Sequence, residues 1–311
     1  MATNRPSVFI DGEAGTTGLG IRARLENLPQ VALKSLPPAQ RKDPAARREM
    51  MAAVDLVVLC LPDEAALEAV ALADGLGLDA PKLLDASTAH RVHPDWTYGF
   101  AEIEDRQAER IAAAGRVANP GCYPTGAIAL LRPLVDAGIV PPDHPVAINA
   151  VSGYSGGGKS MIAAHDAAGG PAFELYALGL EHKHLPETQL YSGLTRRPIF
   201  VPSVGHFRQG MLVSVPFHLD TLPGKPRGAD LYEVLAERYR DCVQISVVAP
   251  AADGKLEPTA LNDTDRLELS VHANEAQRQA VLVARLDNLG KGASGAAVQN
   301  IRLMLGLDAR A

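Results

Sequence analysis

The feature that most constrains this chain of 311 residues is a set of three evenly spaced glycines near its start, Gly12, Gly15 and Gly18. The apolar segment before them is typical of a buried strand, and the apolar residues that follow at helical spacing indicate an amphipathic helix. A glycine turn in this context lets the backbone approach a pyrophosphate, whose charge the helix N-terminal amides stabilise. We therefore predict a dinucleotide-binding turn that includes Thr16 and Thr17. Because the spacing is not the common G-x-G-x-x-G, an ordinary glycine turn is the alternative.

The residues after the second expected strand indicate which dinucleotide this turn binds. An NAD site usually has an acidic residue about 20 positions after the turn, which holds the ribose 2′-hydroxyl. This chain has Lys34 and Ser35 there, then Arg41 and Lys42, and no acidic residue before Asp43. Cations and a hydroxyl suit a 2′-phosphate, so we predict NADP as the cofactor and Ser35 as one of its contacts. The alternative is that Arg41 and Lys42 lie on a solvated surface.

The pattern of apolar residues predicts two domains. Strand-like and helical segments alternate up to about residue 120, which favours an α/β fold with a Rossmann-type doubly wound parallel sheet. Beyond about residue 122 the strands are longer and alternate apolar with polar residues, so we predict an α+β domain with an antiparallel or mixed sheet that has one polar face. The end of the chain is helical in pattern. The strands that we expect are residues 7–11, 31–36, 55–61, 82–85 and 116–118, then 146–151, 199–204, 211–219, 243–248, 266–273 and 280–287.

The segment 119–126 places a cysteine at the start of a helix. Its prolines and glycines fix an irregular turn, and Pro124 is compatible only with the first turn of the helix that follows. Cys122 therefore lies at or next to a helix N-terminus, where amides and the helix dipole stabilise a thiolate and lower the thiol pKa. We predict that Cys122 is a nucleophile. A buried structural cysteine is the alternative, and it is the interpretation that we favour for Cys60 and Cys242.

A cysteine nucleophile needs a base, and the segment 205–210 contains a candidate. His206 can relay protons near neutral pH, and Arg208 can bind a carboxylate or a phosphate through its forked guanidinium. A polar turn that only connects two strands is the alternative. His182 and His184 suggest a metal site, but no third ligand recurs at a recognisable spacing, so we expect no metal.

Charge and composition disfavour other classes of protein. The chain has 36 acidic residues against 30 Lys and Arg, a net charge of −6, and no basic block that would bind nucleic acid. No stretch reaches the ~20 apolar residues of a membrane span, and the start of the chain lacks a signal-peptide pattern. Three scattered cysteines are too few for a disulfide framework. We expect a cytoplasmic enzyme that acts on a small molecule.

Several stretches together carry a resemblance to a known family. The most specific is Asn-Pro-Gly-Cys-Tyr-Pro-Thr at residues 119–125, and the others are residues 10–18, 84–91, 152–159, 205–210 and 287–292. They span nearly the whole chain, and they resemble N-acetyl-gamma-glutamyl-phosphate reductase in its shorter form. This family is related to aspartate-semialdehyde dehydrogenase, whose members carry a different turn around the cysteine.

The resemblance implies a reaction of arginine biosynthesis. NADPH would reduce N-acetyl-L-glutamyl 5-phosphate to N-acetyl-L-glutamate 5-semialdehyde and phosphate, through a thioester on Cys122 and with His206 as the proton relay. Aspartate-semialdehyde dehydrogenase and acetyl-aminoadipyl-phosphate reductase are the enzymatic alternatives. An NADP-binding redox sensor that uses Cys122 as its switch is the alternative from another class.

The resemblance also implies an arrangement of contacts and domains. Arg208 and Asn119 would bind the substrate, and Asn288 would contact the cofactor. The helix of residues 288–311 would then return to the NADP-binding domain of residues 1–121, and residues 122–287 would form the catalytic and oligomerisation domain of a homo-oligomer, a tetramer or a dimer. The glycine-rich residues 152–159 would close over the site. Alternatives to Arg208 as substrate ligands are His182, His184 and Lys159.

Overall fold

The computed structural model describes residues 5–307 and divides the chain into two compact units. Unit 1 runs to Pro120 and resumes at Ala293, and unit 2 comprises Gly121–Gly292. The chain therefore passes from one unit to the other twice. Residues 288–292, which we expected to belong with the nucleotide-binding domain, are part of unit 2 instead. The reason is that Asn288 is hydrogen-bonded to other residues of unit 2.

Unit 1 is built on a six-stranded sheet in which all neighbouring strands are parallel. The strand order is β2-β1-β3-β4-β6-β5, which confirms the doubly wound parallel sheet. The strands are β1 (Ser7–Asp11), β2 (Ala32–Lys34), β3 (Leu56–Leu59), β4 (Lys82–Asp85), β5 (Thr97–Tyr98) and β6 (Arg116–Ala118), and the helices are α1 (Thr16–Glu26), α2 (Pro44–Ala52), α3 (Asp63–Asp74), α4 (Gln107–Ala113) and α9 (Gly295–Met304).

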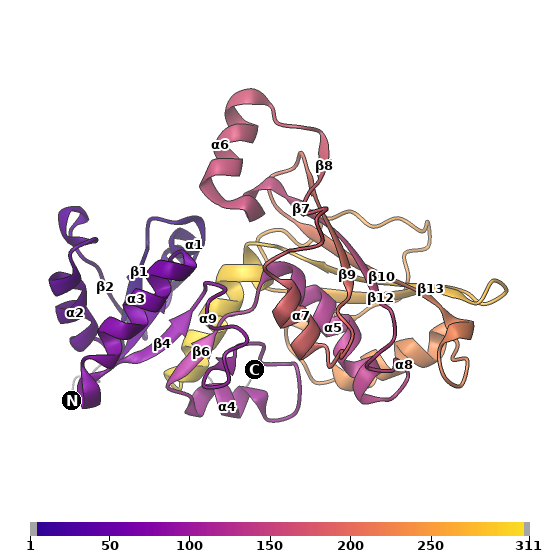
Figure 1. Ribbon diagram of the computed structural model, residues 1–311, viewed down its shortest axis with the longest axis horizontal. Coiled ribbons are helices and arrows are strands. Elements are labelled where there is room, and N and C mark those ends of the chain that lie inside the picture. Colours follow the sequence, from indigo (N-terminus) through magenta and orange to yellow (C-terminus); the bar gives the residue numbers. More distant parts are fainter. Residues whose placement is uncertain (1–4, 308–311) are drawn as a thin grey trace. The chain divides into compact units, whose positions relative to one another are not determined.

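Helices cover both faces of this sheet, because successive strand residues point to opposite sides (Figure 1). Val8 and Ile10 of β1 belong to a core that includes residues of α1, α4 and α9. Phe9, which lies between them in sequence, belongs to a second core with residues of α2 and α3. The continuous apolar runs of these strands follow from this burial on two faces.

Unit 2 is built on a seven-stranded mixed sheet with the order β11-β12-β13-β10-β7-β9-β8. The pairs β7–β9 and β11–β12 are parallel, and the others are antiparallel. Helices α5 and α8 pack against strands of this sheet (Figure 1). The strands are β7 (Ala147–Gly153), β8 (Phe173–Leu175), β9 (Ile199–Gly205), β10 (Met211–His218), β11 (Ile245–Val247), β12 (Leu267–Asn274) and β13 (Gln279–Leu286), and the helices are α5 (Cys122–Asp136), α6 (Gly158–Ala168), α7 (Leu185–Tyr191) and α8 (Gly228–Arg238).

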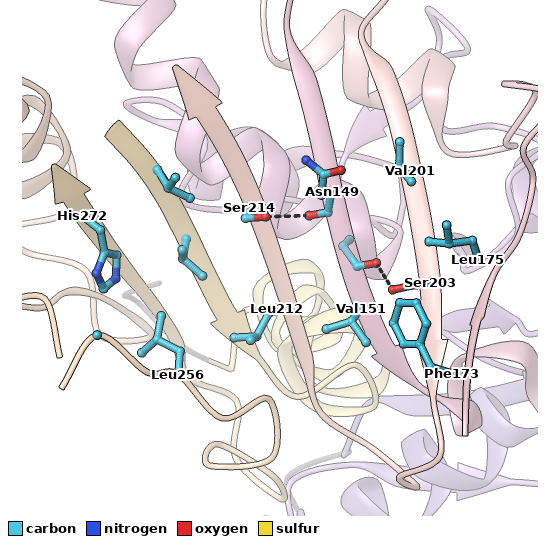
Figure 2. Close-up of a pocket in the computed structure, with 14 residues that line it drawn as sticks. Asn149, Val151, Phe173, Leu175, Val201, Ser203, Leu212, Ser214, Leu256 and His272 are labelled. Carbon is cyan, nitrogen blue, oxygen red and sulfur yellow. Dashed lines mark hydrogen bonds between the residues drawn. The ribbon is translucent and has the colours of Figure 1, made fainter. Parts of the chain in front are cut away.

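The face of this sheet away from α5 is not polar, contrary to our expectation. Val213 of β10 faces α5, where a Cβ atom on Gly126 would lie 2.9 Å from its side chain. Leu212, next in the strand, points to the other face, where it lines a hollow of about 710 Å³ together with Val151 and Val201 (Figure 2). Apolar side chains therefore occupy both faces of the central strands.

Residues 152–159 do not form the glycine-rich loop that we expected. They complete β7, form a 3-10 turn at Tyr154–Gly157 and begin α6. A π turn at Gly290–Ser294 likewise precedes α9, where we expected regular helix from residue 292. None of the helices within residues 5–307 is both long and apolar enough to cross a membrane.

Candidate active site

The glycine turn of unit 1 is packed so closely that a side chain would not fit at two of its positions. Gly12 has φ +88°, and a Cβ atom there would collide with the backbone carbonyl of Cys60. At Gly18 a Cβ atom would lie 2.6 Å from the carbonyl oxygen of Gly12. These contacts bring the start of α1 against the end of β1, as a dinucleotide-binding turn requires.

Helix α1 begins at Thr16 and has no side chain at its cap. Its N-cap residue, Gly15, is extended, with φ −73° and ψ 166°. The first amides of the helix, including that of Thr17, have no helical carbonyl to bind, so they suit an anion. The structure therefore brings the predicted pyrophosphate contacts together in one turn.

A buried carboxylate in the same turn binds two of the residues that we expected at the 2′-phosphate, Ser35 and Arg41, together with Arg22. Oε1 of Glu13 accepts from Nη2 of Arg41 at 2.5 Å, and Oε2 accepts from Nη1 of Arg22 at 2.6 Å and from Oγ of Ser35 at 2.9 Å. Nη1 of Arg22 also donates to Ser35 Oγ at 2.8 Å. Two guanidinium groups and a hydroxyl form a donor set that fits a phosphate.

Two members of this cluster were missed by the sequence analysis. The signal for Arg22 and Glu13 was present, because Glu13 lies inside the glycine turn and Arg22 stands on the helix that follows. Arg41 was assigned either to the phosphate or to a solvated surface, and it is ion-paired with Glu13. Lys34 and Lys42 are exposed.

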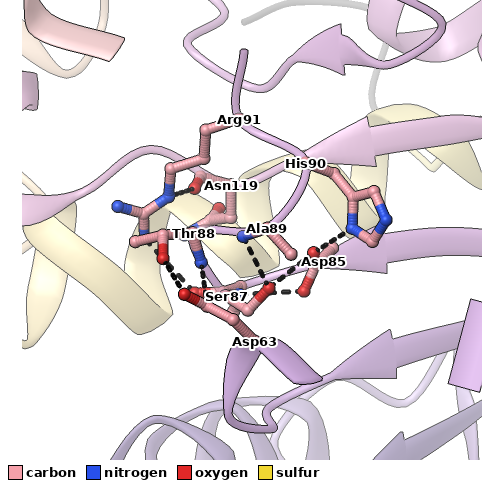
Figure 3. A network of polar contacts seen from close by, with 9 residues as sticks. Asp63, Asp85, Ser87, Thr88, Ala89, His90, Arg91 and Asn119 are labelled. Carbon is pink, nitrogen blue, oxygen red and sulfur yellow. Dashed lines mark hydrogen bonds and ion pairs between the residues drawn. The ribbon is translucent and has the colours of Figure 1, made fainter. Parts of the chain in front are cut away.

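A polar network fixes the loop that follows β4 (Figure 3). Asp85, which is fully buried, accepts from Ser87 Oγ at 2.7 Å and is paired with Nδ1 of His90 at 2.6 Å. The His90 ring stacks on Trp96 with 4.2 Å between ring centroids. Nε of Arg91 donates to the backbone oxygen of residue 119 at 3.0 Å, so the loop also supports the segment that leads out of β6.

Asn119, a predicted substrate ligand, is buried within unit 1. Its Nδ2 donates to the carbonyl oxygen of Ala293 at 3.2 Å, and its Oδ1 accepts from Nδ2 of Asn300 at 3.1 Å. These contacts tie the end of β6 to α9. Substrate binding by Asn119 stays a prediction.

Cys122 is the first residue of α5, as its turn predicts. The N-cap residue Gly121 is extended, with φ −74° and ψ 152°, and its amide donates to Oε2 of Glu187 at 3.1 Å. Glu187 is only 1% exposed and comes from the first turn of α7. On another side a Cβ atom at Gly292 would lie 3.0 Å from Cβ of Cys122. A carboxylate that is far away in the sequence and a glycine therefore both lie next to the turn that carries the thiol.

Aromatic residues surround the position after the thiol. The hydroxyl of Tyr123 donates to the carbonyl oxygen of Ser203 and accepts from the hydroxyl of Tyr176, each at 3.1 Å. Burial raises the pKa of Tyr176 to about 12, and it also raises the pKa of Tyr123. The His182 ring lies against Tyr123, and burial lowers the pKa of His182 to about 4. Both tyrosines are therefore protonated and His182 is neutral at physiological pH.

His206, the predicted base, is exposed and held by a second histidine. Its Nδ1 lies 2.9 Å from Nδ1 of His165, and the two rings stack. His165 is buried and stacks on Tyr154. Arg208, also exposed, forms no ion pair with any residue that the structure describes. His165 could not be predicted from the sequence, because its place beside His206 depends on the folding of α6.

Asn288, the predicted cofactor contact, has both ends of its side chain engaged within unit 2. Its Oδ1 accepts from the amide of Gly210 at 2.8 Å, and its Nδ2 donates to Oγ of Ser155 at 2.9 Å. The residue thereby joins the segment around Arg208 to the 3-10 turn after β7.

The structure supports the structural role that we expected for Cys60. All three cysteines are free thiols. Burial raises the pKa of the Cys60 thiol to about 12, with nearby Asp85 and Asp11 adding to the effect, so this thiol stays protonated.

Within residues 5–307 no group of three or more His, Cys, Asp or Glu side chains is arranged to hold a metal ion.

Comparison with known proteins decides the family. The model of the semialdehyde dehydrogenase dimerisation domain matches residues 122–288. N-acetyl-gamma-glutamyl-phosphate reductase from Burkholderia cenocepacia is 52% identical, and the alignment covers 98% of this chain and 99% of that protein. The reductase of the same name from Brucella ovis is also 52% identical, over 97% of this chain and 99% of that protein. The chain belongs to the N-acetyl-gamma-glutamyl-phosphate reductase family. This finding confirms the resemblance seen in the sequence.

Solved structures of other proteins have a fold similar to that of this reductase family member. Aspartate semialdehyde dehydrogenase II from Vibrio cholerae, complexed with ASA, has a TM-score of 0.70 at 17% identity and covers 98% of this chain and 99% of its own. Aspartate semialdehyde dehydrogenase with NADP from Candida albicans has a TM-score of 0.65 at 15% identity and covers 97% and 100%. These structures show the fold alone. The relatives that share 52% identity are named as reductases, so the family is one of oxidoreductases, which disfavours the non-enzymatic redox sensor.

Proposed function

We propose that the chain reduces N-acetyl-L-glutamyl 5-phosphate to N-acetyl-L-glutamate 5-semialdehyde with NADPH, as a step of arginine biosynthesis. The observation that carries the proposal is the position of Cys122 at the first residue of α5. Relatives that share 52% of their residues over nearly the whole chain bear the name of this reductase.

Cys122 divides the reduction into two steps. Its thiolate, stabilised by the first turn of α5, attacks the carbonyl carbon of the acyl phosphate. The carbon–oxygen bond to phosphate breaks, phosphate leaves, and a thioester remains on the sulfur. The nicotinamide, when bound, supplies the hydride that converts this thioester to the aldehyde. The carbon–sulfur bond breaks in this second step, and the thiolate of Cys122 is restored.

His206 is the residue that we propose as the proton relay. Because its Nδ1 is held by His165, its Nε2 is the ring atom that exchanges protons. A proton given to the departing phosphate can in this way be replaced from solvent, since His206 is exposed. His165 fixes the orientation of the ring.

Recognition of the substrate carboxylate is assigned to Arg208. Its guanidinium is exposed and forms no ion pair within residues 5–307, so it is available to a ligand. His182 and His184 are weaker candidates: His182 is neutral because of its lowered pKa, and His184 is buried at the N-cap of α7.

NADPH is supported as the cofactor by the residues around the glycine turn. The open N-terminus of α1 suits the pyrophosphate, and Arg22, Ser35 and Arg41 supply donors of the kind that a 2′-phosphate requires. The fit of these residues favours NADPH over NADH.

We also propose that the chain forms a homo-oligomer through the hollow face of the unit 2 sheet. The family model that matches this unit describes a dimerisation domain. Phe173 and Leu175, at one margin of the hollow, are 58% and 47% exposed (Figure 2). An apolar surface of this kind favours association with another copy. Light scattering on a Leu212→Glu variant tests this, and a smaller assembly than the wild type is the expected result.

The activity is tested in the reverse direction, as phosphate-dependent formation of NADPH. N-acetyl-glutamate semialdehyde and aspartate semialdehyde are supplied side by side to the wild type and to Cys122→Ala. We expect turnover only on the acetylated substrate, with NADP, phosphate and Cys122 all required. A preference for aspartate semialdehyde would reassign the substrate, and turnover by Cys122→Ala would overturn the thioester mechanism.

A further inference from the structure

The carboxylate of Glu13 occupies the centre of a donor set that three separate segments supply. Arg22 comes from α1, Ser35 follows β2, and Arg41 lies in the turn after it. Both carboxylate oxygens are engaged, at 2.5 Å with Arg41 and at 2.6 and 2.9 Å with Arg22 and Ser35. The Glu13 side chain is only 7% exposed. Burying a carboxylate is costly unless it is paired, and two guanidinium groups and a hydroxyl pair with this one.

The same donors suit a second anion. A ribose 2′-phosphate binds guanidinium groups in forked pairs and accepts from hydroxyls, which is the set that Glu13 now uses. Two anions cannot accept the same donor hydrogens, and like charges placed side by side repel each other. The carboxylate and a phosphate therefore compete for Arg22, Ser35 and Arg41.

We propose that Glu13 is a specificity-determining residue that acts as an internal competitor of the 2′-phosphate. In the free protein its carboxylate holds Arg22, Ser35 and Arg41 in place, and a 2′-phosphorylated nucleotide must displace it from them. A nucleotide with a bare 2′-hydroxyl leaves the ion cluster intact. Glu13 thus lowers the preference for NADP over NAD without forming part of the catalytic machinery. The inference rests on the proposed function, since it takes the glycine turn to bind NADP.

The experiment compares the binding of two nucleotide fragments, 2′,5′-ADP and 5′-AMP, by titration calorimetry. The variant is Glu13→Gln. Its matched control is Glu26→Gln, because Glu26 accepts from Nε of Arg22 at 3.0 Å on the exposed side of α1 and contacts neither Ser35 nor Arg41. We expect Glu13→Gln to bind 2′,5′-ADP at least about fivefold more tightly than the wild type. Binding of 5′-AMP should stay within about twofold, and Glu26→Gln should leave both fragments within about twofold.

The inference is overturned if folded Glu13→Gln binds 2′,5′-ADP no more tightly than the wild type does. Thermal unfolding followed by circular dichroism shows whether the variant is folded. Should it not fold, Glu13→Asp keeps the charge but withdraws the carboxylate by one methylene, and the same tightening is expected. If the wild type and the variants bind 5′-AMP but none binds 2′,5′-ADP, the NADP assignment itself fails. If the wild type binds 2′,5′-ADP and the Glu13 variants do not improve on it, only the role of Glu13 fails.

Discussion

The starts of α1 and α5 are built on the same plan and stabilise negative charge in different ways. Both helices begin after a glycine N-cap in an extended conformation, Gly15 and Gly121. At α1 the first residue is Thr16, and the anion is expected to come from a bound nucleotide. At α5 the first residue is Cys122, and the anion that we propose there is the thiolate of this residue itself. One helix start is therefore suited to the charge of a bound ligand, and the other to the charge that we propose for its own cysteine.

The surroundings of the two helix starts differ accordingly. The turn before α1 is held by backbone contacts, of Gly12 with Cys60 and of Gly18 with Gly12. The turn before α5 is held by a side chain from another helix, Glu187, which accepts from the amide of Gly121. Close backbone packing leaves room for a large ligand, whereas a buried hydrogen bond fixes the direction of one thiol.

The largest expected effect tests whether the charge of α5 resides on its cysteine. Replacing Cys122 by Ser should lower turnover at least about 1000-fold, because the hydroxyl is a far weaker nucleophile than a thiolate at neutral pH. The reverse assay with N-acetyl-glutamate semialdehyde measures this. Cys242→Ser is the matched control and should retain turnover within about twofold. Equal losses in both variants would contradict the assignment.

The next effect tests the backbone packing before α1. In Gly18→Ala the new Cβ atom would lie 2.6 Å from the carbonyl oxygen of Gly12, so the turn must open. We expect binding of 2′,5′-ADP to weaken by about 50-fold and the free energy of unfolding to fall by about 1–3 kcal/mol. Calorimetry and urea denaturation measure the two changes. Gly115→Ala, where a Cβ atom would have nothing within 4 Å, is the control, and a similar loss there would show that packing at Gly18 is not the cause.

A smaller effect tests the side chain that holds the other turn. Glu187→Ala removes the acceptor of the Gly121 amide, and a buried amide without its acceptor costs about 1–3 kcal/mol of unfolding free energy. We also expect iodoacetamide to alkylate Cys122 several times more slowly, because without this hydrogen bond the turn holds the thiol less firmly at the helix N-terminus that stabilises a thiolate. Glu187→Gln retains an acceptor oxygen and should restore most of the rate and stability. Should Gln behave like Ala, the charge of Glu187 would matter instead of its hydrogen bond.

The smallest effect concerns the histidine beside the thiol turn. Burial lowers the pKa of His182 to about 4, below its usual value of 6.5. Between these values the unfolded chain binds a proton that the folded chain does not, so stability falls as the pH falls from 6.5 to 4. His182→Gln should reduce this fall by on the order of 1–2 kcal/mol in urea denaturation. His218→Gln, at an exposed position of β10, controls for the loss of a histidine. An unchanged slope in His182→Gln would show that the ring is not shielded in the folded protein.

Both helix starts could be predicted from the sequence because each depends on residues close together in the chain. The spacing of Gly12, Gly15 and Gly18 determines one, and Pro124, two residues after Cys122, determines the other. Most strands could be predicted for the same reason, since burial on one or two faces leaves a local pattern. The exceptions are β5 and β8, which have two and three residues and are too short to show such a pattern.

The contacts that complete each site could not be predicted in the same way. Glu187 is 66 residues from Gly121, and His165 is 41 residues from His206. Their proximity follows from the strand order and from where short helices pack, and no local pattern records either. The uncovered face of the unit 2 sheet was wrongly expected to be polar, because the serines and Asn149 there stand among valines and leucines that line the hollow.

The two passages of the chain between the units have a consequence for synthesis of the protein. Ala297, Ile301, Leu303 and Met304 of α9 complete a core of unit 1 whose other buried residues lie before residue 121. Unit 2 is contiguous, so all of it leaves the ribosome before α9 does. Domains generally fold as units as they emerge. The part of the protein that is made first is therefore finished last, and its apolar surface must be kept from aggregating until the final helix arrives.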